Sequence, residues 1–63
     1  MLGSTIQPAI GNPSVYAPDL LQAERLRLLT LVRARGRNQR GCYAAIKMIA
    51  RIHEVLEKEV TDV

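Results

Sequence analysis

RARGRNQRG, at residues 33–41, is the stretch that decides the fold predicted by the sequence. Gly36 can adopt the left-handed backbone conformation that commonly ends a helix, and Arg33 and Arg35 stand near the negative end of that helix, where cations are favourable. Asn38 is a suitable N-cap for a second helix. Two long helices joined by about three residues pack antiparallel. The stretch therefore predicts the turn of a helical hairpin.

The two helices that flank the turn can be placed from their start signals and lengths. The segment PDLLQ (18–22) opens the first helix, because the Asp19 carboxylate can accept N–H groups of the first turn and Gln22 stands three residues later, as in a capping box. We expect this helix at about residues 19–35, and the second at about residues 39–59 with a length of ~30 Å. The expected fold class is all-α, an antiparallel two-helix hairpin (19–63) preceded by an extended N-terminal arm (1–18).

The N-terminal arm differs from the rest of the chain in composition. It contains all 3 prolines and almost no charge. Proline lacks a backbone N–H and pushes the preceding residue toward extended geometry, so we expect an extended or turned arm. An unstructured terminus is the ordinary alternative, although such tails are low in hydrophobicity. The apolar residues expected to dock the arm on a surface are Ile6, Ile10, Val15 and Tyr16.

Both helices carry wide apolar faces. On the second helix, a 4-3-4-3-4 spacing typical of a heptad seam joins Cys42, Ile46, Ile49, His53, Leu56 and Val60. At ~100° per residue, neighbouring apolar residues widen this sector to roughly half of the helix circumference. On the first helix, we expect one apolar face formed by Leu20, Leu21, Leu28, Leu31 and Val32. One partner helix cannot cover such faces, and large exposed apolar patches mark protein interfaces.

The size of the chain also argues for a partner. A chain of 63 residues is marginally stable unless a disulfide, a metal or association supports it. Cys42 has no second cysteine to pair with, and Cys42 with His53 cannot fill a metal site. We therefore expect a homo-oligomer, a complex with a larger protein, or both, completed as a helical bundle. The expected interface residues are Leu21, Leu28, Val32, Ile46, Ile49, Ile52, His53 and Leu56.

Catalysis has little support in the sequence. No nucleophile or acid is placed to work with His53, and the flanking Glu54 and Glu57 are expected to project to other faces. Phosphate-binding loops, dinucleotide glycine patterns and paired carboxylates are absent from the sequence. Cys42 is expected to be a small buried hydrophobe. We therefore expect no enzyme activity, no cofactor, no metal and no small-molecule substrate.

Charge is distributed unevenly along the expected hairpin. All of the basic residues except Lys58 fall between Arg25 and Arg51 without an intervening acid, and acidic residues dominate the C-terminal end. The turn end is therefore expected to be basic and the opposite end acidic. The basic turn is formed by Arg33, Arg35, Arg37 and Arg40. It can contact phosphates, face an acidic protein surface, or remain a solvated turn, since the net charge is only +3.

Membrane binding and export are disfavoured by the pattern of apolar residues. The first residues lack the basic segment of a signal peptide, and no apolar run approaches the roughly 20 residues of a membrane-spanning helix. Basic residues of the first helix are spread around it, unlike those of a membrane-surface helix. A cytoplasmic location is therefore expected.

The sequence favours a small non-enzymatic protein–protein interaction module. An adaptor, an inhibitor or regulator of another protein, and a small assembly component such as a viral structural or accessory protein all fit. The alternative is a dimeric nucleic-acid-binding regulator that uses the Arg-rich turn at residues 33–40. A helix-turn-helix is disfavoured, because the second helix is about twice the length of a recognition helix and follows an arginine-rich turn.

Overall fold

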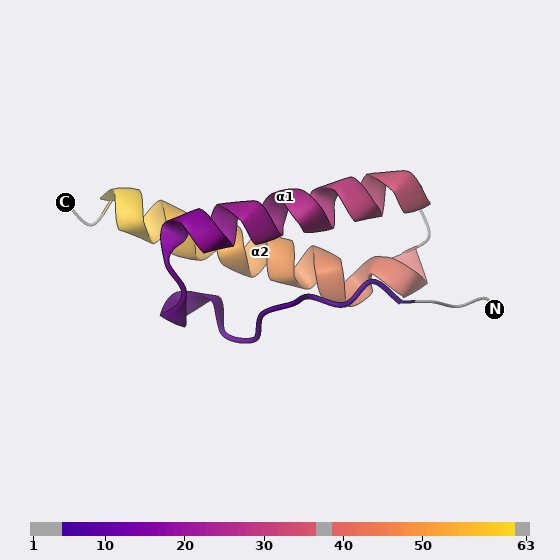
Figure 1. The fold of residues 1–63 in the computed structure, drawn as a ribbon, viewed down its shortest axis with the longest axis horizontal. Helices are drawn as coiled ribbons and strands as arrows, with labels where there is room; N and C mark the ends of the chain where they lie inside the picture. The colour runs from indigo at the N-terminus through magenta and orange to yellow at the C-terminus, as the bar shows by residue number, and fades with distance from the viewer. Residues whose placement is uncertain (1–4, 37–38, 62–63) are drawn as a thin grey trace.

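The chain folds as an antiparallel pair of helices with an N-terminal segment packed along it (Figure 1). This computed structural model describes residues 5–36 and 39–61. The short 3-10 helix η1 (Pro13–Val15) precedes α1 (Pro18–Arg35), and α2 (Gln39–Thr61) follows the turn. The described residues contain helices and no strand, so the all-α two-helix hairpin expected from the sequence is confirmed.

Helix α1 begins one residue earlier than its expected capping signal. Ala17, with an extended backbone (φ −66°, ψ 150°), is the N-cap, Pro18 follows it, and no side chain caps the helix. Proline is well suited to the first helical position because its missing N–H would be unpaired there in any case. The helix therefore includes Pro18, and the predicted Asp19 and Gln22 capping box is wrong. Asp19 lies within the first turn, where its negative charge is still favourable.

Gly36 ends α1, as expected, but with a different backbone geometry. Its φ is 82° and its ψ is −139°, whereas a left-handed helical residue has a positive ψ of about 47°. The Gly36 N–H donates to the carbonyl oxygens of Val32 and Arg33, both at 3.2 Å. This backbone conformation is open almost only to glycine. The predicted N-cap of the second helix, Asn38, lies outside the described residues.

Helices α1 and α2 pack on a core of seven buried apolar residues, which are Ile6, Leu21, Leu28, Cys42, Ala45, Met48 and Ile52. Cys42 is thus the small buried hydrophobe expected from the sequence. The buried face of α2 lies beside the predicted seam, because Ile46 is 42% exposed and His53 is also exposed. The seam is therefore wrong at these two positions. An apolar sector that covers half of the helix circumference does not by itself determine which side of the helix is buried. Here both α1 and η1 pack against α2, and their positions determine the buried side.

The apolar face expected on α1 is also only partly buried. Leu21 and Leu28 are fully buried and Val32 is half-buried against the core, whereas Leu20 is 59% exposed and Leu31 is exposed too. Leu20 and Leu31 are therefore not part of the buried face of α1. Glu24 lies on the buried side instead, because the N-terminal segment brings polar partners to it.

The N-terminal segment of residues 5–17 runs back along the helix pair from the turn end to the start of α1 (Figure 1). Near the turn, the Ile6 N–H donates to the Gly41 carbonyl oxygen at 2.9 Å. Farther along, the Asn12 side chain accepts the Ser14 N–H at 3.1 Å and begins η1, which buries Pro13. We call this segment the arm.

Candidate interaction surface

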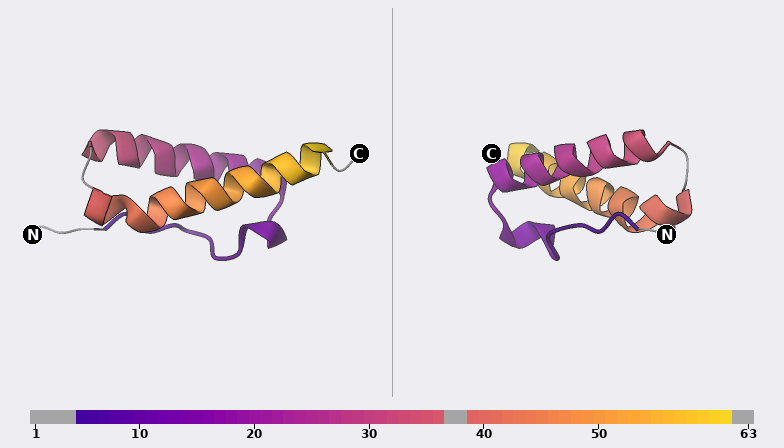
Figure 2. Two further views of the ribbon diagram at one scale, coloured as in Figure 1. Left: turned by 180° about the vertical axis from the view of Figure 1, so that it is seen from behind. Right: turned by 45° about the vertical axis from the view of Figure 1, so that its right-hand side comes forward.

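The arm covers one of the two broad faces of the helix pair. It contacts α1 through Glu24 and Arg27 and contacts α2 through the Gly41 carbonyl oxygen. Toward the end of α2, η1 packs on that helix beside Val55. In both views of Figure 2 the arm remains on the same side of the helices. The two helices therefore form one layer, and the arm forms a second layer on one face only.

The opposite face carries apolar side chains that no described segment outside the two helices covers. At about 100° per residue, most of these side chains point about 120–180° away from Glu24 on α1 or from Val55 on α2, and one, Leu56, points about 100° away from Val55. We call this surface the open face and define it by Leu26, Leu29, Ile46, Ile49 and Leu56. Leu26 is 65% exposed and Ile46 is 42% exposed, while the other three are half-buried. Clustered large aliphatic side chains on one face are typical of a protein interface.

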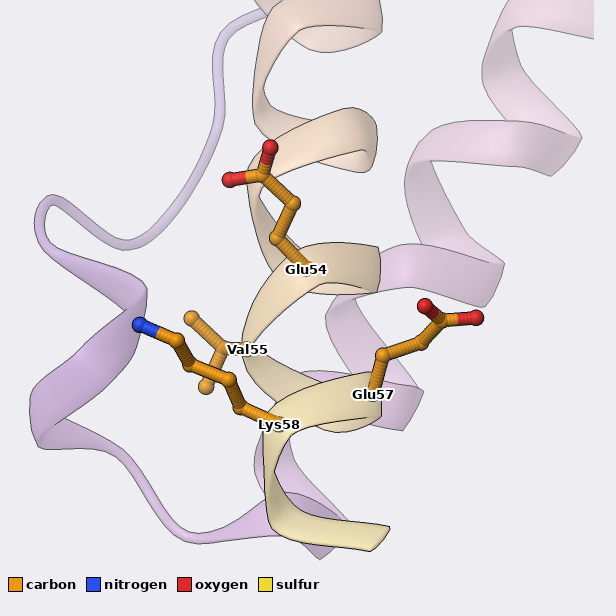
Figure 3. Close-up of a pocket in the computed structure, with 4 residues that line it drawn as sticks. All are labelled: Glu54, Val55, Glu57 and Lys58. Carbon is orange, nitrogen blue, oxygen red and sulfur yellow. The ribbon is translucent and has the colours of Figure 1, made fainter. Parts of the chain in front are cut away.

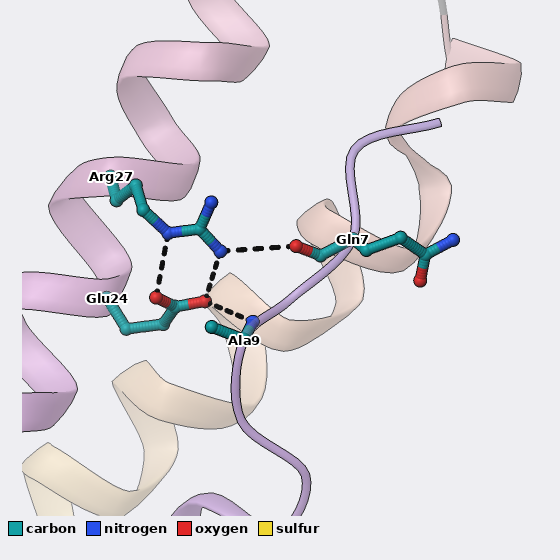
Figure 4. A network of polar contacts seen from close by, with 4 residues as sticks. All are labelled: Gln7, Ala9, Glu24 and Arg27. Atoms are coloured by element: carbon teal, nitrogen blue, oxygen red, sulfur yellow. Dashed lines mark hydrogen bonds and ion pairs between the residues drawn. The ribbon is translucent and has the colours of Figure 1, made fainter. Parts of the chain in front are cut away.

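The arm is held by a polar cluster on α1 (Figure 4). Arg27 donates from Nε to Glu24 Oε1 at 2.9 Å and from Nη2 to Glu24 Oε2 at 2.7 Å. Glu24 Oε2 also accepts the Ala9 N–H at 2.7 Å, and Arg27 Nη2 donates to the Gln7 carbonyl oxygen at 3.1 Å. Because both partners in the arm are backbone groups, this cluster binds the backbone of the arm independently of its side chains.

Burial and hydrogen bonding act in opposite directions on the Glu24 carboxyl, which is only 7% exposed. The hydrogen bonds from Arg27 lower its pKa, burial raises it, and the Ala9 N–H and the positive charge of Arg27 lower it further. The net effect is a pKa below the ordinary value, so Glu24 is charged at neutral pH. The same hydrogen bonds raise the pKa of Arg27. Sequence reasoning missed this pair, although a Glu and an Arg three residues apart on a helix were a usable signal.

The predicted interface residues divide into core and surface. Leu21, Leu28 and Ile52 are fully buried in the chain's own core, which corrects the expectation that they face a partner. Val32, Ile49 and Leu56 pack against that core and are half-buried. Ile46 and His53 are exposed. The surface left for a partner is therefore narrower than predicted and is centred on the open face.

The four residues expected to dock the arm behave differently from one another. Ile6 is buried in the core, and Ile10 is half-buried against it. Val15 is 71% exposed and Tyr16 is also exposed, so these two do not dock the arm on the chain's own helices. They stand at η1 and its C-cap, where Pro13 is the residue turned inward.

The basic turn is only partly described by the structure. Arg33 is exposed at the end of α1. The Arg35 guanidinium lies over the backbone of α2, where a Cβ atom on Gly41 would stand 2.8 Å from Arg35 Nη2. The side chains of Arg37 and Arg40 lie outside the described residues. Of the described arginines at this end, Arg33 is thus the one that points to solvent, while Arg35 packs across the turn.

His53 contacts a carboxylate at the exposed side of α2. Its Nε2 lies 3.2 Å from Glu57 Oε2, so the expectation that Glu57 projects to another face is wrong. A depression of about 440 Å³ nearby is lined by Glu54, Val55, Glu57 and Lys58 (Figure 3). Glu54 and Glu57 point to different sides of the helix in this view, so they do not form a converging pair of carboxylates. The lining residues that the structure describes all belong to α2 and present no converging acid–base pair.

Metal binding and membrane insertion are two further possibilities for the described residues. Within residues 5–36 and 39–61, no group of three or more His, Cys, Asp or Glu side chains is placed to hold a metal ion. In the same ranges, no helix has both the length and the apolar content needed to cross a membrane. The comparisons with known proteins add no further assignment, since no family model, no curated protein and no solved structure matches the chain.

Proposed function

We propose that the chain is a small non-enzymatic protein–protein interaction module that binds its partner through the open face. The observation that carries this proposal is the exposure of Leu26 and Ile46 on the face opposite the arm, at 65% and 42%. Burying aliphatic surface stabilises a complex by about 25 cal/mol per Å² before the costs of association are subtracted. An adaptor, a regulator of another protein and an assembly component are all modules of this kind.

The arm supports the same proposal from the other side of the molecule. Ile6, Pro13 and the Glu24–Arg27 pair occupy the face that the arm covers, so the chain itself already covers much of that face, although Leu20 on the same side remains exposed. The open face is the remaining broad apolar surface between the described helices. A partner that packs there adds a further layer of helices to the pair, as in a helical bundle.

The alternative function is nucleic-acid binding through the basic turn. The exposed Arg33 favours it, because an arginine in solvent can contact a phosphate. Two other arginines are engaged within the chain, since Arg27 pairs with Glu24 and Arg35 packs over Gly41. Fewer free cations weaken the electrostatic contribution, so we rank this function second.

Site-specific photo-crosslinking in the native host tests the proposed function. A photoreactive amino acid replaces Ile46 on the open face in one variant and Leu20, which is exposed on the arm side, in a matched control. We expect protein adducts from position 46 and few from position 20. No adducts at position 46, or equal adducts at both positions, would contradict a role of the open face in protein binding.

Titration with duplex and single-stranded DNA at two salt concentrations tests the alternative. Strong binding with a steep salt dependence in the wild type, lost in Arg33→Glu, supports the nucleic-acid function. Weak binding that Arg33→Glu leaves unchanged supports the protein-binding function.

A further inference from the structure

We infer that the partner on the open face is a second copy of this chain, packed antiparallel so that the turn end of each hairpin lies over the helix-terminal end of the other. This inference rests on the proposed function, because it names the partner of the same surface. The apolar residues of the open face lie between two oppositely charged ends of the hairpin.

The open face has a mainly aliphatic centre, which the half-buried Arg25 flanks, and charges of opposite sign toward its two ends. Because Arg35 lies across from Gly41 and the helices are antiparallel, Leu26 stands at about the level of Ala50. Arg33 is seven residues from Leu26 toward the turn, or ~10 Å along α1. Glu57 is seven residues from Ala50 in the opposite direction, or ~10 Å along α2. The positive and negative ends are therefore equally far from the apolar centre.

This symmetry makes the surface complementary to itself. A two-fold axis at the level of Leu26 places the aliphatic centre of one copy on that of the other, and it brings the Arg33 end of each copy over the Glu57 end of its partner. The two-fold symmetry of most protein dimers requires such self-complementary patches. A parallel arrangement places like charges at the same level, which is unfavourable. The charge distribution thus selects both the partner and its orientation.

The acidic end is broader than Glu57 alone. Asp19 at the start of α1 and Glu54 and Glu59 near the end of α2 are exposed at the same end of the hairpin. Opposite charges about 10 Å apart still attract at low ionic strength, since the screening length is ~10 Å at 0.1 M salt and longer below it. Direct contact between Arg33 and Glu57 is not needed for this preference.

Sedimentation of the full-length chain across a concentration series tests the inference. We expect a monomer–dimer equilibrium in the wild type. Leu26→Glu and Ile46→Glu introduce a carboxylate into the apolar centre and are expected to raise the dimer Kd by at least about tenfold. Leu20→Glu, at a side chain that is 59% exposed but on the arm side, is expected to change the Kd by less than about twofold. Circular dichroism on the same samples shows that each variant remains helical.

Charge reversal tests the antiparallel orientation. Arg33→Glu and Glu57→Arg are each expected to weaken the dimer by about two- to fivefold at low salt, and the double variant is expected to restore it, because it inverts both ends together. In a parallel dimer, each single reversal replaces one like pair by another and changes little.

The outcomes separate this inference from the proposed function. A helical wild type that remains a monomer to high concentration overturns the inference. If position 46 still forms crosslinks to a different protein in the host, the proposed function stands and the partner is not a second copy. If the chain is a monomer and position 46 forms no crosslinks, both fail. A dimer that Leu26→Glu leaves intact overturns the assignment to the open face.

Discussion

The carboxylate of Glu24 accepts the backbone N–H of Ala9, with 2.7 Å between Oε2 and the amide nitrogen. Arg27, held by the same carboxylate, donates to the carbonyl oxygen of Gln7. Two side chains one helical turn apart on α1 therefore bind a donor and an acceptor of the arm. Backbone groups covered by packing need partners, and the arm, which has no strand neighbour among the described residues, finds them on these side chains and, at Ile6, on the Gly41 carbonyl oxygen.

Removing the Glu24 carboxylate should loosen the arm and destabilise the chain. Glu24→Ala leaves the Ala9 N–H without its acceptor and Arg27 without its ion pair, so we expect a loss of about 1–3 kcal/mol in the free energy of unfolding. Urea denaturation measures this loss, and hydrogen exchange of the Ala9 amide shows whether the arm is released. Glu54→Ala, at an exposed site of α2, is the control and should change little. Unchanged protection of the Ala9 amide in Glu24→Ala would mean that this cluster does not hold the arm.

Stability should fall in acid through the same residue. The hydrogen bonds from Arg27 lower the pKa of Glu24 below its ordinary value of 4.5. A carboxyl whose folded-state pKa is lowered stabilises the fold fully above its unfolded-state pKa, and this contribution is lost as the pH falls through the folded-state pKa. The difference in unfolding free energy between wild type and Glu24→Gln should therefore be largest at pH 6 and shrink toward pH 3. A difference that stays constant over this range contradicts the assignment.

Gly36 should tolerate substitution poorly. Its φ of 82° and ψ of −139° lie where a side chain is strained, so Gly36→Ala is expected to cost about 1–3 kcal/mol of stability. Gly11→Ala is the matched control, because Gly11 lacks a positive φ and has nothing within 4 Å of the added Cβ position. Thermal unfolding followed by circular dichroism compares the two. Equal melting temperatures would show that the turn adapts to a side chain at residue 36.

Gly41 and Arg35 should show energetic coupling. An added Cβ at residue 41 stands 2.8 Å from Arg35 Nη2, so the guanidinium must move in Gly41→Ala. Alanine also has a higher helix propensity than glycine, by up to about 1 kcal/mol. This gain in stability should appear in full only in the Arg35→Ala background. A double-mutant cycle from urea denaturation measures the difference. The same change in stability on Gly41→Ala in both backgrounds would show that the position of the Arg35 guanidinium does not require a glycine at residue 41.

The helices and their turn were predictable because their signals are local. Gly36 marks the end of α1, and its N–H donates to carbonyl oxygens only three and four residues earlier in the chain. The start of α1 was misplaced by one residue, because both Pro18 and Asp19 are favourable near a helix start and the sequence does not say which one occupies the first position.

The candidate surface was less predictable because it depends on rotation and on distant partners. The apolar sector of α2 is wide enough that Ile46 and His53 fit a heptad seam as well as Met48 and Ile52 do, yet only the last two are buried. Glu24 gave little sign of burial in the sequence. Its acceptor role depends on a backbone N–H 15 residues away, and the donor role of Arg27 depends on a carbonyl oxygen 20 residues away.

The sequence by itself determined that this chain forms two antiparallel helices with a basic turn, because helix propensity, glycine geometry and charge act between near neighbours. Only the tertiary structure decided which sides of those helices are buried and which face remains open. The position of the arm determined which face remains open. The arm covers the face that holds Glu24 and Val55, and Leu26 and Ile46 remain exposed on the opposite face. A pair of helices with wide apolar surfaces has more than one side to bury, and the short arm can cover only one of them.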